Sequence, residues 1–143
     1  MTNEEAKKFA FDSFVTAFEA GNEHMIDEYF AADLEFCNHS VAKNYSLHQI
    51  KLSVHEVHKK YRDLKSKVKD VMVDGNCLAF RVEQHAFFVP DDEYVNMDVM
   101  NLYKLSDGKV KEWRLWFSQD SSDNGYKRIN HGHDVAWIED PGK

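Results

Sequence analysis

The stretch NLYKLSDGKVKEWRLWF, residues 101–117, alternates apolar and polar side chains on both sides of a central Asp-Gly pair. Alternation with a period of two is typical of β-strands. An Asp-Gly pair between two such runs predicts a hairpin, because glycine readily adopts the positive φ that a type I′ turn requires. In the second half of the stretch, Trp113, Leu115 and Phe117 share one face of the strand. This face is predicted to look into the interior of the protein.

The same alternation runs through the whole second half of the chain. Apolar-alternating runs cover residues 65–73, 76–89, 94–105 and 109–118. Turn-forming residues separate these runs at positions 74–76, 90–93 and 106–108. Runs of this length, bounded by Gly, Pro, Asp and Asn, are typical of consecutive strands. The pattern therefore predicts a four-stranded antiparallel meander.

Helices are predicted ahead of the meander. Thr2 and Glu5 have the spacing of a capping box, and apolar residues then recur at helical intervals. Gly21 is suited to end this first helix, because a left-handed residue is common there. Asn22 can cap a second, shorter helix.

A third helix and an extra strand complete the predicted architecture. Ser46 and Gln49 repeat the capping-box spacing ahead of a helix with one apolar stripe. Residues 34–39 predict a short strand before it. Helices followed by a meander favour an α+β fold, with three N-terminal helices packed on a strongly bent antiparallel sheet.

Composition limits the classes of function. The chain has 143 residues with 43% hydrophobic and 30% charged side chains, which is typical of one globular domain. Its net charge of −7 argues against a duplex nucleic-acid binder, because such binding needs clustered Lys and Arg. The charged N-terminus does not resemble a signal peptide, and no apolar run approaches the ~18 residues of a membrane span. We therefore predict a cytoplasmic protein that binds neither nucleic acid nor membrane.

Neither cysteine nor histidine spacing predicts a metal site. Cys37 and Cys77 lack the paired spacing of zinc ligands, which favours free thiols in a reducing compartment. The histidines at 55 and 58 are three residues apart rather than four, unlike the pair on a zinc-protease helix. No metal is predicted.

The face opposite Trp113 carries unexpected apolar side chains. By alternation, Met100, Leu102 and Trp116 point away from the helices, where a monomer exposes its sheet to water. Large apolar groups at such positions mark an interaction surface. Closed symmetric dimers are the commonest oligomers, so we predict that these three residues lie in a homodimer interface.

Two stretches carry a family resemblance. DGNCLAFRVEQHA, residues 74–86, and the closing hairpin at 101–117 resemble the nuclear-transport-factor-2-like superfamily, in particular its SnoaL-like polyketide cyclase branch. The resemblance spans residues 4–118. It implies a cone at residues 1–120, in which a curved sheet wraps around the helices and leaves an apolar pocket. Residues 121–143 would then form a polar C-terminal tail, or a flap that docks Trp137 and Ile138.

The resemblance implies chemistry without a metal or bound cofactor, performed by a carboxylate or a histidine in the pocket. Asp98 lies inside a hydrophobic strand, and His85 and His39 match positions where such sequences carry histidines. These are the predicted catalytic residues: Asp98 or His85 moves the proton and His39 assists. Strict alternation favours the opposite reading for Asp98 and His85, because it turns both side chains away from the apolar face. The aspartate that many members carry after the closing tryptophan is missing, since Phe117 or Ser118 occupies its place.

Other residues are predicted to contact a ligand. Gln84 and Asn101 interrupt apolar strand faces, and a polar group on a core face must find a partner. They either bond each other or orient a substrate oxygen. The full predicted ligand-binding set is Trp113, Phe117, Gln84, Asn101, Tyr103 and Tyr29.

These features give one leading hypothesis and one alternative. The leading hypothesis is a protein that binds a small apolar molecule and transforms it as a cofactor-independent isomerase, cyclase or hydratase. The alternative is a non-catalytic dimeric binding or assembly module, in which the aromatic residues form the core. The missing family aspartate favours the alternative.

Overall fold

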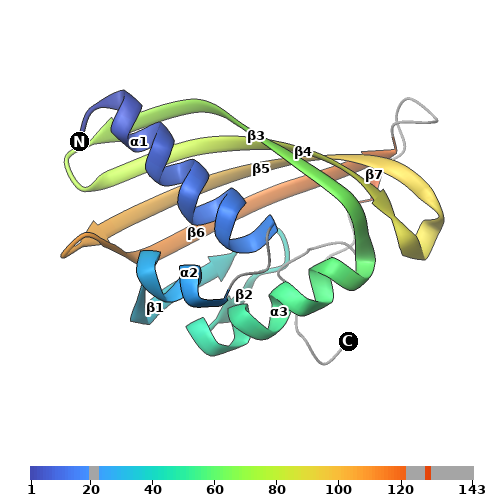
Figure 1. Ribbon diagram of the computed structural model, residues 1–143, viewed down its shortest axis with the longest axis horizontal. Coiled ribbons are helices and arrows are strands. Elements are labelled where there is room, and N and C mark those ends of the chain that lie inside the picture. Colours follow the sequence, from blue (N-terminus) through green and yellow to red (C-terminus); the bar gives the residue numbers. More distant parts are fainter. Residues whose placement is uncertain (20–22, 122–127, 130–143) are drawn as a thin grey trace.

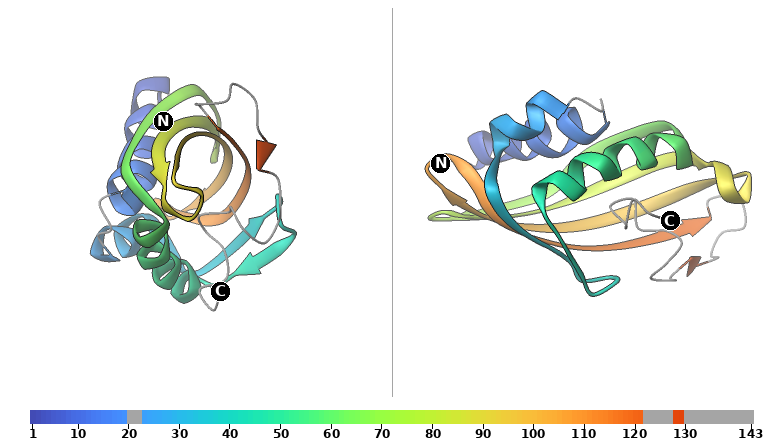
Figure 2. Two further views of the ribbon diagram at one scale, coloured as in Figure 1. Left: turned by 90° about the vertical axis from the view of Figure 1, so that its right-hand side faces the viewer. Right: turned by 90° about the horizontal axis from the view of Figure 1, so that it is seen from below.

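The computed structural model describes residues 1–19, 23–121 and 128–129 (Figure 1). Its helices are α1 (Asn3–Ala10), the π-helix η1 (Phe11–Glu19), α2 (Glu23–Tyr29), α3 (Leu47–Lys60) and the 3-10 turn η2 (Val89–Asp91). Its strands are β1 (Phe30–Asn38), β2 (Lys43–Tyr45), β3 (Tyr61–Asp74), β4 (Cys77–Phe88), β5 (Glu93–Ser106), β6 (Lys109–Ser121) and β7 (Arg128–Ile129). Helices α1, α2 and α3 lie on one face of a curled sheet (Figure 2), so the predicted α+β architecture is confirmed.

The sheet has the strand order β2-β1-β6-β5-β4-β3, with β7 paired to β6. Strands β3 to β6 pair antiparallel with their chain neighbours, which confirms the predicted meander. The predicted extra strand is longer than residues 34–39 and pairs in parallel with β6. The sheet is therefore mixed rather than purely antiparallel. The parallel pair joins β1 to β6, which are separated in the chain by β2, α3 and the first three strands of the meander.

Turns and bulges give the sheet its bend. Asp107 and Gly108 both have positive φ, at 53° and 78°, as the predicted type I′ turn requires. The edge strand β3 shifts its register twice, between Arg62 and Lys65 and again between Lys69 and Met72. An aspartate with positive φ lies at each shift. Bulges of this kind bend a strand and increase its twist.

Both predicted capping boxes are present. The Thr2 side chain accepts from the Glu5 amide, and Ser46 accepts from Gln49 in the same way at α3. The first predicted helix is continuous with a π-helix, since the residue after α1 keeps helical torsion angles and η1 follows directly. Gly21 and Asn22, the predicted boundary to the second helix, lie outside the described residues.

The core gathers around Trp113 on the face of the sheet that packs against the helices, here called the inner face. Its ring stacks on Phe30 at 5.1 Å and meets Phe36 at 4.4 Å and Phe14 of η1 at 6.2 Å. Trp113 is fully buried, as are Leu115 and Phe80 to within 1%. The side chains predicted to face inward on β6 therefore do so, and they join strands to helices.

The predicted tail or flap, with Trp137 and Ile138, lies outside the described residues apart from Ser121 at the end of β6 and the two residues of β7. Within the part of the chain that the structure describes, no helix combines the length and hydropathy needed to cross a membrane.

Candidate functional site

Uncharged polar side chains cross the apolar inner face in one row. Cross-strand register places Gln84 of β4 beside Met97 of β5, and Met97 beside Gln119 of β6. Ser66 of the edge strand pairs with Gln84 on the other side. We call Ser66, Gln84, Met97 and Gln119 the amide row. The row brings two carboxamides onto one face of the sheet, one on each side of a methionine.

Each glutamine of the amide row has one hydroxyl partner. Gln84 Nε2 donates to Ser66 Oγ at 3.0 Å. Tyr61, the first residue of β3, donates from its hydroxyl to Gln119 Oε1 at 2.6 Å. Each bond uses one polar atom of the carboxamide, Nε2 in Gln84 and Oε1 in Gln119. The second polar atom of each carboxamide takes no part in these bonds.

The other end of each carboxamide is buried without a hydrogen-bond partner. Gln84 is 6% exposed and Gln119 is fully buried, yet Gln84 Oε1 and Gln119 Nε2 make no hydrogen bond among the described residues. Asn38 at the end of β1 adds a third such atom, Nδ2, while its Oδ1 accepts from the Ser40 amide. Most buried polar groups in proteins are paired, so a group of unpaired ones calls for an explanation.

Asn101 is bonded differently from the glutamines. Its Oδ1 accepts from the indole Nε1 of Trp113 at 2.9 Å, and both side chains are buried. One of the two alternatives for these residues, a bond between Gln84 and Asn101, does not form, because Asn101 lies opposite Phe80, four residues from Gln84 on β4. Asn101 therefore serves as the hydrogen-bond acceptor for the buried indole N–H of a core tryptophan.

A second polar pair joins η1 to the sheet. Ser13 Oγ lies 3.1 Å from the hydroxyl of Tyr103, and both residues are fully buried. Burial raises the pKa of Tyr103 strongly, whereas the hydrogen bond with Ser13 lowers it by less. The phenol therefore stays neutral at physiological pH.

The remaining predicted ligand-binding residues are an inner-face phenylalanine and a tyrosine of α2. Phe117 is buried beside Val99 in the next row toward Trp113. Tyr29 is half-buried, and its ring meets Phe9 edge-on at 5.5 Å. The structure thus brings Gln84, Asn101, Tyr103 and Phe117 together with Trp113 on the inner face, and it places Tyr29 at the helices.

The three predicted catalytic residues lie elsewhere. Asp98 points to the outer face of the sheet, half-exposed, where its carboxylate accepts from Arg81 at 3.2 Å. The same guanidinium donates to Asp70 at 2.8 Å, and these two carboxylates raise the pKa of Arg81. Alternation in the sequence predicted an outward side chain for Asp98, and in the structure Asp98 lies on the outer face.

His85 and His39 also belong to the outer side. His85 Nδ1 lies 2.8 Å from Asn96 Oδ1, and its ring stacks on Tyr94 at 5.7 Å. The ring of His39 stacks on Trp116 at 4.6 Å, with Arg114 within 3.3 Å. Neither histidine shares the inner face with the amide row, although His85 follows Gln84 directly on β4. The three predicted catalytic residues make separate contacts.

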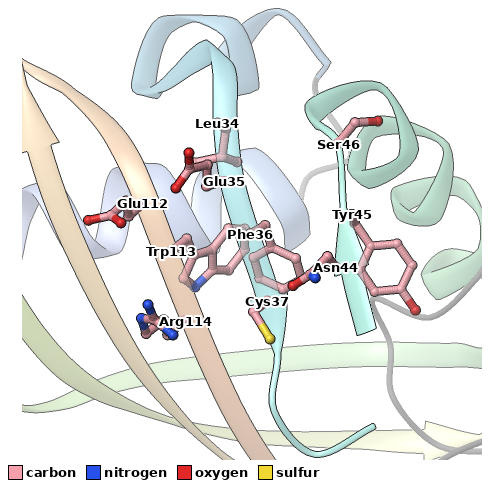
Figure 3. A pocket seen from close by; sticks show the side chains of 10 residues that line it. All are labelled: Leu34, Glu35, Phe36, Cys37, Asn44, Tyr45, Ser46, Glu112, Trp113 and Arg114. Carbon is pink, nitrogen blue, oxygen red and sulfur yellow. The ribbon is translucent and has the colours of Figure 1, made fainter. Parts of the chain in front are cut away.

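Two hollows border these outer-face residues. A groove of about 510 Å³ runs along β1, β2 and β6 (Figure 3), where Glu35 faces Glu112 and Cys37 faces Arg114 in register. A broader hollow of about 660 Å³ is lined mostly by outward residues of β3, β4 and β5, including His85 and Asp98, and it also borders Ser66, Gln84 and Met97 of the amide row. Within the described residues, no group of three or more His, Cys, Asp or Glu side chains is arranged to hold a metal ion.

Three inner-face residues were missed by the sequence reasoning. Gln119 lies just beyond the predicted end of its strand, although it continues the spacing of Trp113 and Phe117. Tyr61 lies ahead of the first predicted strand, which begins at residue 65, but it opens β3. Glu93 was read as a turn residue; it opens β5, four residues before Met97 and on the same side, and it is half-buried.

The site favours hydrogen bonding over proton transfer. The buried polar side chains of the described chain are all uncharged: Ser13, Asn38, Ser53, Gln84, Asn101 and Gln119. Carboxamides donate and accept hydrogen bonds but do not titrate in the physiological range. The arrangement can hold and orient a neutral group.

Solved structures share this fold. A putative hydroxylase, AclR from Streptomyces galilaeus, superposes with a TM-score of 0.66 at 18% identity, over 85% of this chain and 82% of its own. An LEH-like epoxide hydrolase of M. tuberculosis gives 0.63 at 16% identity, over 80% and 84%. A putative SnoaL-like polyketide cyclase from Jannaschia sp. CCS1 gives 0.64 at 16%, over 82% and 90%. At these identities the likeness shows the fold alone.

Sequence comparison identifies the family. Among curated proteins, none has a sequence that matches this chain. The family model described as SnoaL-like domain matches residues 11–113, from the start of η1 to the core tryptophan of β6. This span covers most of the chain and confirms the resemblance read from residues 74–86 and 101–117. The chain belongs to the SnoaL-like domain family.

Proposed function

We propose that this protein binds a small, largely apolar molecule between its helices and the inner face of the sheet, with the amide row as the polar contact. One observation carries the proposal: Gln84 and Gln119 each bury a carboxamide atom that has no partner in the described chain. An unpaired buried polar group costs about 1–3 kcal/mol. A ligand that forms hydrogen bonds with these atoms removes this free-energy cost when it binds.

The fold supports the same proposal. The similar structures include a putative hydroxylase, an epoxide hydrolase and a putative polyketide cyclase, and this supports a small-molecule ligand for the chain. Aromatic and aliphatic side chains surround the amide row, with Phe117 and Val99 in the next row. Apolar walls with a few placed polar groups are typical of small-molecule sites.

Binding without acid–base catalysis suits the described site better than the isomerase, cyclase or hydratase hypothesis. Asp98 and His85 point to the outer face, and Asp98 is already paired with Arg81. A general base must lie within hydrogen-bond reach of the proton it removes. An enzymatic version would need a different base, and Glu93, on the inner side of β5, is the carboxylate we would test for it.

We further propose that two copies associate through the outer face. Met100 and Trp116 are register neighbours, and each is 41% exposed. Leu102 is half-buried beside them, which extends the apolar centre. Charged side chains surround this centre, among them Arg81, Asp98 and Arg114. An apolar centre with a charged rim is the usual anatomy of a protein interface.

A matched pair of variants tests the binding proposal. Gln84 and His85 are adjacent on β4 and face opposite sides of the sheet. Thermal shift and native mass spectrometry would be run with apolar carbonyl compounds, epoxides, steroids and polyketide fragments. A ligand at 100 times its Kd adds about 2.7 kcal/mol of stability. We expect Gln84→Met to abolish or weaken the shift and His85→Ala to leave it unchanged. The reverse pattern would place the site on the outer face and refute the proposal.

A further inference from the structure

The amide row also specifies the chemical class of the ligand. Resting on the proposed function, we infer that the ligand is a neutral molecule with a hydroxyl or carbonyl group at each of two ends and an apolar body between them. Three properties of the row indicate this class: the spacing of its carboxamides, the chemistry of their partners, and the charge of the surrounding side chains.

Spacing fixes where the polar groups of the ligand lie. Gln84 and Gln119 are separated by one strand, with Met97 between them. Neighbouring strands lie ~4.8 Å apart, so their Cα atoms are about 10 Å apart across the row. Met97 is 3% exposed and offers an apolar surface between the two carboxamides. A ligand that bonds both must therefore be polar at its ends and apolar in its middle.

The hydroxyl partners make each carboxamide adaptable. In the structure, Gln84 leaves an acceptor free and Gln119 leaves a donor free. Their partners, Ser66 Oγ and Tyr61 Oη, are hydroxyls, which can both donate and accept. Either carboxamide can therefore turn by 180° and keep its bond. A hydroxyl on the ligand suits both orientations, and a carbonyl suits the one that presents Nε2.

The charge of the surrounding side chains excludes anionic ligands. The buried polar side chains of the described chain are uncharged, and the nearby hydroxyls of Tyr61 and Ser66 are neutral donors and acceptors. Glu93, four residues before Met97 on the same side of β5, would repel a carboxylate. Moving a charge into such surroundings without a countercharge is costly. A carboxylate in place of a hydroxyl is thus expected to abolish binding.

Three compounds with one skeleton test the inference: naphthalene-2,6-diol, naphthalene-2,6-dicarboxylate and 2,6-dimethylnaphthalene. Their affinities for the full chain would be measured by calorimetry or fluorescence titration at neutral pH. Each recovered hydrogen bond is worth roughly 3- to 10-fold in affinity. We expect the diol to bind roughly 10- to 100-fold more tightly than the dimethyl compound, and the dicarboxylate not to bind.

Variants assign the effect to the amide row. Gln119→Met and Gln84→Met should each remove one polar contact and bring the diol closer to the dimethyl compound, whose affinity should stay the same or improve. His85→Ala, on the outer face, serves as the control and should change neither affinity.

The outcomes separate this inference from the proposed function. Equal affinity of diol and dimethyl compound, or binding of the dicarboxylate as tight as that of the diol, would overturn the inference and leave small-molecule binding intact. A preference for the diol that survives both glutamine variants would also overturn it. Failure of all three compounds to bind at any soluble concentration, together with no shift in the wider ligand panel, would overturn both.

Discussion

Two amides on the inner face should respond oppositely to removal of their polar atoms. Asn101→Leu removes the acceptor of the Trp113 indole N–H, whereas Gln84→Met removes a carboxamide with one atom unpaired. Both replacements are apolar and of similar size to the original. The comparison therefore isolates hydrogen bonding from packing.

The expected magnitudes follow from the partners. In Asn101→Leu, a buried indole N–H loses its 2.9 Å bond, which costs about 1–3 kcal/mol. In Gln84→Met, the bond to Ser66 is lost at a cost of about 1 kcal/mol, while removal of the unpaired Oε1 returns about 1–3 kcal/mol. A change of 1 kcal/mol moves the Tm by about 3 °C in a domain of this size. We expect a Tm lower by about 3–9 °C for Asn101→Leu and unchanged or up to about 6 °C higher for Gln84→Met.

Differential scanning calorimetry of the ligand-free protein, supported by urea unfolding, would measure both effects. Equal m-values in the wild type and the variants would show that the unfolded reference has not changed. If Gln84→Met destabilises the protein as much as Asn101→Leu, Gln84 supports the fold as a structural residue. That result would refute the reasoning that assigns its free atom to a ligand.

Three further predictions concern the phenol, the third helix and the outer face. Because burial raises the pKa of Tyr103, the folded state keeps a proton that the unfolded chain releases above its ordinary pKa of about 10. The contribution of this phenol to the free energy of unfolding is complete below about pH 10 and falls by about 1.4 kcal/mol per pH unit above it. The Tm of the wild type should therefore fall more steeply with alkaline pH than the Tm of Tyr103→Phe. Parallel Tm curves would contradict this. Ser46→Ala removes the capping box of α3 and should lower the free energy of unfolding by about 0.5–2 kcal/mol in urea titrations, and no change would show that the box is dispensable. Trp116→Asp should shift the protein toward monomers in analytical ultracentrifugation while its near-ultraviolet circular dichroism is retained, whereas Met72→Asp, on the edge strand and 65% exposed, should not; a wild type that is monomeric at all concentrations would rule out the dimer.

Sequence periodicity predicted the elements of this fold because their signals are local. Alternation in β4, β5 and β6 told inward side chains from outward ones, and it placed Trp113 inside and Asp98 outside. Capping boxes at Thr2 and Ser46 marked the starts of two helices correctly. Each of these signals depends on neighbours within a few residues.

Contacts between distant segments could not be predicted from local patterns in the sequence. The parallel pairing of β1 with β6 joins residues separated by about half of the chain, and nothing local specifies its direction. The π-helical form of η1 was not predicted either, since the apolar spacing of its residues also fits an α-helix. The polar contact between Ser13 of η1 and Tyr103 of β5 joins residues that are 90 positions apart, so no local pattern could predict it.

The candidate site was predicted in part. Gln84 and Asn101 were recognised as polar interruptions of an apolar face, but their partners depend on cross-strand register. Gln119 was missed because the predicted strand ended at residue 118, three residues before the observed end of β6. Catalytic roles were assigned to Asp98 and His85 from residue type and resemblance, while alternation had already turned both outward.

A crystal structure of the protein with naphthalene-2,6-diol tests the central claim most directly. We expect the naphthalene ring over Met97, with one oxygen within hydrogen-bond distance of the Gln84 carboxamide and the other within hydrogen-bond distance of the Gln119 carboxamide. A diol bound in the outer hollow beside His85 and Asp98, or two ordered waters that satisfy both glutamines while the diol stays absent, would contradict it.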